Sequence, residues 1–217
     1  MKLKHFILII LFISLLVYSW LHLGTILPKI KNSKKANDKV LSLPVEDNKQ
    51  LKRLGVYAKQ LLQFSAANKF NTSICFLVDM KVHSGKNRFF VYNLIKDSIV
   101  AAGLVAHGSC NQGFLLNPSF SNEKGCGCTS IGKYIVCNPY KGNFGNSFKL
   151  KGIDKSNSHA FDRYVVLHAY DCVPDDEIYP VPLCNSLGCP MVSYHFLDKL
   201  TDILSKANKP ILLYVFN

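Results

Sequence analysis

Two short segments of the sequence contain the residue types that nucleophilic catalysis needs. Val165-Val166-Leu167-His168 is a β-type run that ends in a histidine, and Ser186-Leu187-Gly188-Cys189-Pro190 is a glycine-containing turn around a cysteine. A free thiol titrates at about pH 8.5, so at neutral pH it needs a neighbouring base to become a nucleophilic thiolate. His168 is therefore the candidate general base, and Cys189 the candidate nucleophile of an acyl-transfer reaction, provided that the fold brings the two segments together.

The neighbours of Cys189 restrict how an oxyanion can be bound. Gly188 allows the backbone to approach a substrate closely. Pro190 has no N–H and disfavours the helical conformation at Cys189. We therefore expect an oxyanion hole that uses the amide of Cys189 together with that of Gly188 or Leu187. By spacing alone, a Gly-Cys-Pro turn and a strand-end histidine are more often purely structural.

The remaining cysteines allow either disulfides or a metal site. Zinc-binding cysteines are typically separated by about two to four residues, and the spacing of residues 110, 126, 128 and 137 fits this poorly, so we predict no metal. Cys172 and Cys184 bracket a proline-rich loop between the candidate base and nucleophile, where either a disulfide or two free thiols is possible. The seven cysteines other than Cys189 are Cys75, Cys110, Cys126, Cys128, Cys137, Cys172 and Cys184.

The N-terminal segment, residues 1–28, has the pattern of an export signal. Lys2 and Lys4 precede the run Phe6–Leu23, which contains no Asp, Glu, Lys or Arg. The run is at the lower length limit for crossing a bilayer, and no small-x-small cleavage site follows it. We therefore predict an uncleaved signal-anchor, with a cleaved signal peptide and secretion to the periplasm as the alternative. Either places the domain in the cell envelope, outside the cytoplasm.

A polar, basic linker is expected over residues 29–47. Just after the apolar run, Lys29, Lys31, Lys34 and Lys35 can meet anionic lipid headgroups. The formal net charge of the whole chain is +12. No nucleic-acid-binding motif accompanies this charge, so we predict no nucleic acid partner. An anionic cell envelope is a simpler partner for this charge than a nucleic acid. A solvated basic surface without a partner explains the charge equally well.

The spacing of apolar residues predicts a mainly β domain with flanking helices (α+β) over residues 48–217. One helix is expected from a cap at Asp47 or Asn48 to about Ala67, and a second after a cap at Ser193. The expected strands are Ile74–Met80, Arg88–Leu94, Ser98–Ala106, Tyr134–Val136, Phe148–Ile153, Tyr164–His168 and Ile211–Phe216.

The string VVLHAYDCVPDDEIYPVPLCNSLGCPMVS, Val165 to Ser193, resembles the active-site signature of the murein L,D-transpeptidase catalytic-domain family. Within that family it is similar to the branch of exported bacterial proteins with Ser-x-Gly-Cys-Pro around the nucleophile. The resemblance extends over Phe76–Leu94, Gly103–Ser109 and Lys149–His168, and therefore covers nearly all of the domain.

The resemblance implies a β-rich catalytic fold and an enzyme that works without a cofactor on the stem peptides of peptidoglycan. The cysteine of the family attacks the L,D bond of a stem tetrapeptide, D-alanine leaves, and the acyl group passes to an amine of another stem. Cys189 matches the nucleophile and His168 the general base. Gly188 matches the invariant glycine of the motif, and Ser186 matches a hydroxyl residue that orients the imidazole.

Two positions depart from the pattern of many family members. Leu187 stands where they have a histidine, and Met191 where they have an arginine. His107 is the best candidate to lie across the cleft and supply a missing polar contact, with a histidine of no chemical role as the alternative. Arg163 is a candidate ligand for a stem carboxylate, although an ion pair with Asp162 or a neighbour is the more common role of such a residue.

Other functions remain open at this point. Water as the acyl acceptor would make the protein an L,D-carboxypeptidase, and a protein lysine would make it an attachment or release enzyme. In a papain-like or amidase-type cysteine peptidase the cysteine normally precedes the histidine, whereas here His168 precedes Cys189. A non-catalytic wall-binding module would not need a thiolate.

Overall fold

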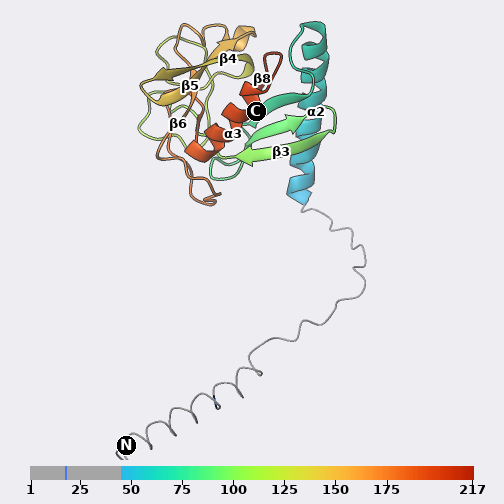
Figure 1. The fold of residues 1–217 in the computed structure, drawn as a ribbon. Coiled ribbons are helices and arrows are strands. Elements are labelled where there is room, and N and C mark those ends of the chain that lie inside the picture. The colour runs from blue at the N-terminus through green and yellow to red at the C-terminus, as the bar shows by residue number, and fades with distance from the viewer. Residues whose placement is uncertain (1–17, 19–44) are drawn as a thin grey trace, which may run out of the picture. The chain divides into compact units, whose positions relative to one another are not determined.

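The computed structural model describes Tyr18 and residues 45–217 (Figure 1). Apart from Tyr18 and residues 45–47, the predicted signal-anchor and linker lie outside the described residues. The described residues from 45 onward belong to one compact unit. Within the described part of the chain, no helix combines the length and the apolar composition needed to cross a membrane.

The described domain is built on one eight-stranded sheet with the strand order β3-β2-β1-β8-β4-β5-β6-β7. Neighbouring strands are antiparallel except for the parallel pairs β1–β8 and β6–β7. The predicted mainly β architecture with flanking helices is confirmed. The elements are α2 (Val45–Ala67), β1 (Ile74–Asp79), β2 (Phe89–Asn93), β3 (Ser98–Gly103), β4 (Gly132–Gly142), β5 (Gly145–Gly152), the 3₁₀ turn η1 (Lys155–Asn157), β6 (Val166–Ala169), β7 (Met191–Val192), α3 (Tyr194–Ser205) and β8 (Leu212–Phe216).

The two helices cover opposite faces of the sheet, because the strands alternate their apolar residues between two cores. In β1, Phe76 and Val78 belong to the core around α3, while Cys75 and Leu77 belong to the core under α2. This alternation is the period-two pattern of a strand that is buried on both faces. Every strand except β3 contributes fully buried residues to the core around α3, and Figure 1 shows α3 lying across the strands and α2 beside β1 to β3.

The predicted cap of the second helix is confirmed. Ser193 has extended backbone angles, and its hydroxyl oxygen accepts a hydrogen bond from the Phe196 N–H at 3.2 Å. The first helix begins at Val45, before the predicted cap at Asp47 or Asn48. Helix ends are the least precise feature of an apolar pattern, since the first turn contributes little to the core.

Strand β4 is much longer than the predicted run Tyr134–Val136. It continues through Pro139, where the register against β5 shifts between Val136 and Pro139. Proline cannot donate a ladder hydrogen bond and is tolerated in strands at such irregularities. The extension forms a long β4–β5 hairpin, which turns between Gly142 and Gly145 and places Ser147 opposite His168 of β6.

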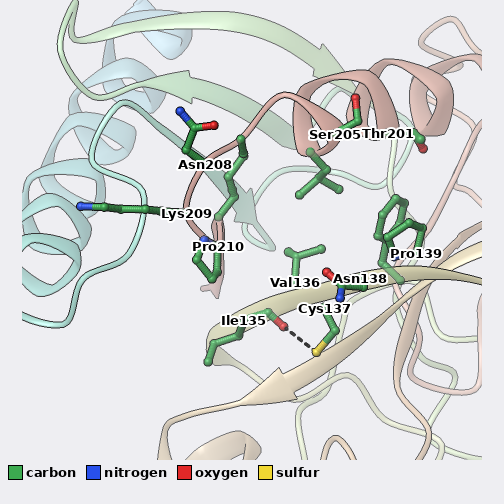
Figure 2. A pocket seen from close by; sticks show the side chains of 14 residues that line it. Ile135, Val136, Cys137, Asn138, Pro139, Thr201, Ser205, Asn208, Lys209 and Pro210 are labelled. Atoms are coloured by element: carbon green, nitrogen blue, oxygen red, sulfur yellow. Dashed lines mark hydrogen bonds between the residues drawn. The ribbon is translucent and has the colours of Figure 1, made fainter.

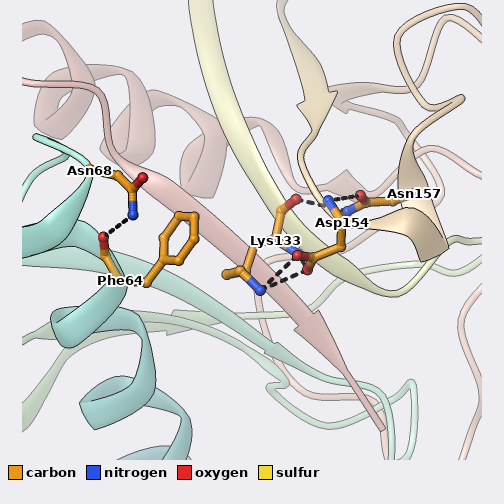
Figure 3. A network of polar contacts seen from close by, with 5 residues as sticks. All are labelled: Phe64, Asn68, Lys133, Asp154 and Asn157. Carbon is orange, nitrogen blue, oxygen red and sulfur yellow. Dashed lines mark hydrogen bonds and ion pairs between the residues drawn. The ribbon is translucent and has the colours of Figure 1, made fainter.

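A polar network ties the segment after β5 to β4 (Figure 3). Asp154 accepts hydrogen bonds from the backbone N–H and the ammonium of Lys133, at 2.7 and 2.9 Å. Asn157, which is fully buried, donates to the Lys133 carbonyl at 2.8 Å and accepts from the Asp154 N–H at 2.9 Å. The ammonium also lies 5.2 Å from the centroid of the Phe64 ring on α2. These contacts fix the start of the segment that leads through Arg163 and Tyr164 into β6.

A buried ion pair joins α2 to the sheet. Asp79 is 1% exposed and accepts two hydrogen bonds from Arg53, at 3.0 and 2.8 Å. A charge left buried after the loss of its partner is strongly destabilising, whereas an exposed pair contributes little.

We predict that Arg53→Met lowers the free energy of unfolding by about 3 kcal/mol, because the buried Asp79 carboxylate loses its ion-pair partner and keeps the Lys81 N–H at 3.0 Å and the more distant charge of Arg88. Urea unfolding of the full chain measures the change. Lys206→Met, which breaks the exposed Lys206–Asp202 pair on α3, is the matched control and should cost about 0.5 kcal/mol or less. Equal losses in the two variants would contradict a structural role for the buried pair.

Candidate active site

The sheet brings the two segments singled out from the sequence to one edge. His168 of β6 pairs in parallel with Met191 of β7, and the His168 N–H donates to the Pro190 carbonyl at 3.4 Å. The Cys189 sulfur accepts a hydrogen bond from the Val166 N–H at 3.4 Å. The candidate nucleophile therefore lies against the strand that carries the candidate base.

The hydrogen bonding of His168 determines which ring nitrogen can act as a base. Nδ1 lies 2.9 Å from the Ala169 carbonyl oxygen. A carbonyl only accepts, so Nδ1 carries the proton and Nε2 keeps a free lone pair. The side chain is 2% exposed, and this burial lowers the pKa of His168, against the smaller opposing effect of the Ala169 carbonyl. The imidazole is therefore neutral at neutral pH and able to accept a proton at Nε2.

The Cys189 thiol is protonated in this arrangement. Burial raises the pKa of Cys189, while the Val166 N–H and the positive charge of Arg163 lower it by less. The thiol donates to the Tyr164 carbonyl at 3.8 Å, and among the described residues no hydrogen bond joins it to His168. Catalytic hydrogen bonds are often long or absent before substrate binds.

Position 188 requires glycine, both because of its backbone angle and because neighbouring atoms leave no room for a Cβ. Its φ is +110°, and a Cβ at this position would lie 2.6 Å from the Cys128 carbonyl oxygen and 3.2 Å from Nη2 of Arg163. Side chains other than glycine rarely adopt such a φ. The turn that carries Cys189 is thus packed directly on the backbone of Cys128.

The two amides that remain available for an oxyanion are those of Leu187 and Cys189. The Gly188 N–H donates to the Ser186 hydroxyl oxygen at 3.0 Å, so the Gly188 amide is engaged. Within the described residues, the amides of Leu187 and Cys189 donate to no protein acceptor. Of the arrangements expected from the sequence, the pair of Cys189 with Leu187 is the one that this geometry leaves open.

Ser186 contacts the nucleophile turn rather than the imidazole. Besides the bond from Gly188, its backbone N–H donates to the His107 carbonyl and its carbonyl accepts from the Ser109 N–H, both at 2.8 Å. The structure records no contact between the Ser186 hydroxyl and His168, so an orienting role of Ser186 on the imidazole stays a prediction. In this structure Ser186 holds the turn in shape.

His107 is buried beside this turn, with both ring nitrogens engaged. Arg88 donates to Nδ1 at 2.9 Å, so the other nitrogen carries the proton and donates to the Leu115 carbonyl, also at 2.9 Å. Burial and the Arg88 charge lower the pKa of His107 to about 4, against the smaller effect of the Leu115 carbonyl. The residue is 1% exposed, and both ring nitrogens already have protein partners, so a polar contact of His107 with substrate stays a prediction.

Arg163 binds three groups of the 121–130 loop, on which Gly188 packs. Its guanidinium donates to the carbonyls of Ser121 and Cys128, at 3.0 and 2.6 Å, and to the Ser130 hydroxyl at 2.5 Å. Asp162 pairs instead with Lys124. Sequence reasoning missed this loop as a support for the site, and no sequence signal could have found it, because its partners lie more than thirty residues away.

The cysteines around the site are partly paired. Disulfides join Cys110 to Cys128 and Cys172 to Cys184, which leaves Cys75, Cys126 and Cys137 as free thiols besides Cys189. Among the described residues, no three side chains of the metal-binding types come together.

A separate pocket of about 580 Å³ lies between β4 and the end of α3 (Figure 2). Cys137 lines it, and its thiol donates to the Ile135 carbonyl at 3.8 Å. No histidine lines this pocket, and neither Cys189 nor His168 does. The β6–β7 edge, where a cysteine and a histidine lie on adjacent segments, is therefore the better candidate site.

The profile of the L,D-transpeptidase catalytic domain family matches residues 47–216. No curated protein matches the chain.

Several solved structures resemble the chain at low identity. An L,D-transpeptidase of Xylanimonas cellulosilytica is 11% identical with a TM-score of 0.40, over 71% of this chain and 68% of its own. The helical cell shape determining protein of Campylobacter jejuni is 13% identical with a TM-score of 0.42, over 66% and 46%. A mutant L,D-transpeptidase of Enterococcus faecium is 13% identical with a TM-score of 0.39, over 66% and 50%. The chain thus spans about half the length of the last two.

We predict that Gly188→Ala lowers the free energy of unfolding by about 1–3 kcal/mol, because alanine is strained at this φ and its Cβ would meet the Cys128 carbonyl. Thermal or urea unfolding measures the loss. Gly113→Ala is the control, since a Cβ there meets nothing within 4 Å, and it should change stability by about 0.5 kcal/mol or less. A Gly188→Ala variant as stable as the control would refute the close contact with Cys128.

Proposed function

The chain belongs to the L,D-transpeptidase catalytic domain family, and from this premise we propose that it cleaves the L,D bond of a peptidoglycan stem tetrapeptide through a Cys189 acyl-enzyme and transfers the acyl group to an amine. The observation that carries the proposal is the state of His168 beside Cys189. Its proton is held on Nδ1 by the Ala169 carbonyl at 2.9 Å, which leaves Nε2 as the base.

The first half of the reaction forms a thioester. Nε2 of His168 removes the proton from Cys189, and the sulfur attacks the carbonyl carbon of the L,D bond. The amides of Cys189 and Leu187 are placed to donate to the oxyanion that develops. The imidazolium then returns the proton to the nitrogen of the departing D-alanine, as the C–N bond breaks.

The second half repeats these steps in reverse order with a new nucleophile. The amine of another stem attacks the thioester carbon while His168 accepts its proton. The C–S bond breaks, and the thiolate takes the proton back from His168. With water in place of the amine, the same residues would perform the hydrolysis of an L,D-carboxypeptidase, so the product distinguishes the two reactions.

Both groups begin neutral, which suits a site that reacts only when occupied. Burial lowers the pKa of His168 and raises that of Cys189, so a separated ion pair is disfavoured before substrate arrives. Attack of the Cys189 sulfur on the substrate carbonyl consumes the thiolate as it forms. Proton transfer to His168 and attack by the sulfur can therefore proceed together.

The proposal includes a location. We propose that residues 1–28 anchor the protein in the membrane and that residues 29–47 link this anchor to the domain in the cell envelope. The support is the charge-poor run Phe6–Leu23 after Lys2 and Lys4, together with the excess of basic residues that gives the net charge of +12. Peptidoglycan would then be within reach of a tethered domain.

We predict that Cys189→Ala lowers D-alanine release from a stem tetrapeptide by about 10⁴-fold or more, because the covalent route is lost. Mass spectrometry of the reaction measures release and shows whether a cross-linked dimer or a shortened stem forms. Cys137→Ala is the control, since Cys137 is also a free, half-buried thiol, and it should retain turnover. Turnover by Cys189→Ala would overturn the proposed mechanism.

We also predict that the native protein keeps its N-terminus. Mass analysis of protein extracted from membranes should find residues 1–4 in place, because no convincing cleavage site follows the apolar run. A mature N-terminus near Gly24 or Thr25 would show instead that the segment is a cleaved signal peptide.

A further inference from the structure

One aromatic ring lies flat on the candidate base. The ring centroids of Phe144 and His168 are 4.1 Å apart, and the rings are inclined by 19°. Tyr170 meets both rings edge-on, at 6.2 Å from Phe144 and 6.3 Å from His168. Phe144 comes from the tip of the β4–β5 hairpin, so an element distant in sequence covers the imidazole.

The position of Phe144 is unusual for a large apolar side chain. The hairpin turns through Asn143 and Phe144, between the paired residues Gly142 and Gly145, and such tips favour small polar residues and glycine. Gly145, with a φ of +72°, supplies the backbone freedom that the turn needs. Phe144 is 45% exposed and belongs to none of the buried clusters, so core packing does not explain it.

We propose that Phe144 is the positioning residue of the general base: its ring holds the imidazole of His168 in the orientation that keeps Nδ1 on the Ala169 carbonyl, and it shields the base from water. This inference rests on the proposed function for the identity of the base. It concerns a residue that does not touch the reacting sulfur and acts through His168.

Two exposed rings contact His168: Phe144 is stacked on its face and Tyr170 meets it edge-on. Ser147 of β5 and Met191 of β7 lie opposite His168 in the register on either side, and both are buried within the sheet. The Nδ1 edge is fixed on Ala169. Phe144 is the contact that comes from an exposed turn, and so it can be changed without opening the sheet.

The titratable groups around His168 do not take over the shielding of its imidazole by Phe144. They are the Tyr170 phenol after β6, the Cys189 thiol before β7, and Lys149 on β5, opposite Val166. The Lys149 ammonium lies over the rings of Tyr140 and Phe161, at 5.5 and 5.4 Å. Burial is the largest influence on the pKa of His168, and it lowers that pKa. The face of the Phe144 ring also attracts an imidazolium, but burial is the larger influence, so we expect loss of the ring to raise the pKa of His168.

The direction of the effect on catalysis follows. A base works only while it is neutral, so kcat/KM falls as the pH drops through the pKa of His168 in the free enzyme. When that pKa rises, the fall occurs at a higher pH. A structural defect alone would lower kcat/KM at every pH and leave the position of the acid limb unchanged.

The first test is the pH dependence of kcat/KM for D-alanine release by the full chain. Phe144→Ala should move the acid limb upward by about 1 pH unit, a fraction of the shift that complete burial produces. Phe144→Tyr, which keeps the ring, should restore the wild-type profile. Phe161→Ala is the matched control, because Phe161 is 46% exposed and its ring lies against Lys149. An unmoved limb in Phe144→Ala, or an equal shift in Phe161→Ala, would overturn the proposal.

The second test needs no substrate, and it separates this inference from the proposed function. NMR titration of the imidazole carbons gives the pKa of His168 directly, with its signal among the seven histidines assigned by its loss in His168→Gln. Phe144→Ala should raise this pKa, and Phe144→Leu, an apolar cover without a ring, should raise it by less. If Phe144→Ala raises the pKa of His168 but the wild type does not turn over stem peptides, the positioning role of Phe144 is supported and the proposed substrate is refuted. Turnover with an unchanged pKa would refute the role of Phe144 alone.

Discussion

The site depends on the parallel pairing of β6 with β7. This pairing sets His168 opposite Met191, and the His168 N–H donates to the Pro190 carbonyl. The turn with Cys189 is therefore held to the edge of the strand that carries the candidate base. Side chains alternate between the faces of a strand, and a slip of one residue exchanges the faces. Leu167 belongs to the core around α3, and its burial therefore keeps His168 on the opposite face.

The nucleophile turn is supported mainly through backbone groups. Gly188 packs on the Cys128 carbonyl, which Arg163 also binds at 2.6 Å, and the Gly188 N–H is held by Ser186. The disulfide from Cys110 to Cys128 closes the same loop. Arg163 thus serves the site by fixing a loop and by its charge, which lowers the pKa of Cys189 although burial acts more strongly in the opposite direction. Within residues 186–190, the Leu187 and Cys189 amides are the ones that donate to no acceptor in the described part of the chain.

Burial has opposite consequences for the two central residues, because it disfavours whichever form is charged. It favours a neutral His168 and a protonated Cys189, so in the proposed reaction the substrate must favour the transfer of the proton. The fold supplies the burial from three sides: the sheet below, the 121–130 loop behind the turn, and the β4–β5 hairpin above. The last of these is the least embedded, since its tip residue Phe144 remains 45% exposed.

The sequence by itself determined the strands whose apolar residues alternate, the Ser193 cap of α3, and the two residues with the chemistry of a base and a nucleophile. These features depend on local periodicity, on a side chain that bonds three residues ahead, and on a motif within 25 residues. The tertiary structure alone decided four other features. They are the length of β4, the hydrogen bonds of His107 with Arg88 and Leu115, the hydrogen bonds of Arg163 to the 121–130 loop, and the stacking of Phe144 on His168. Each depends on which groups lie opposite after folding, and partners distant in the chain leave no periodic or local pattern in the residues themselves.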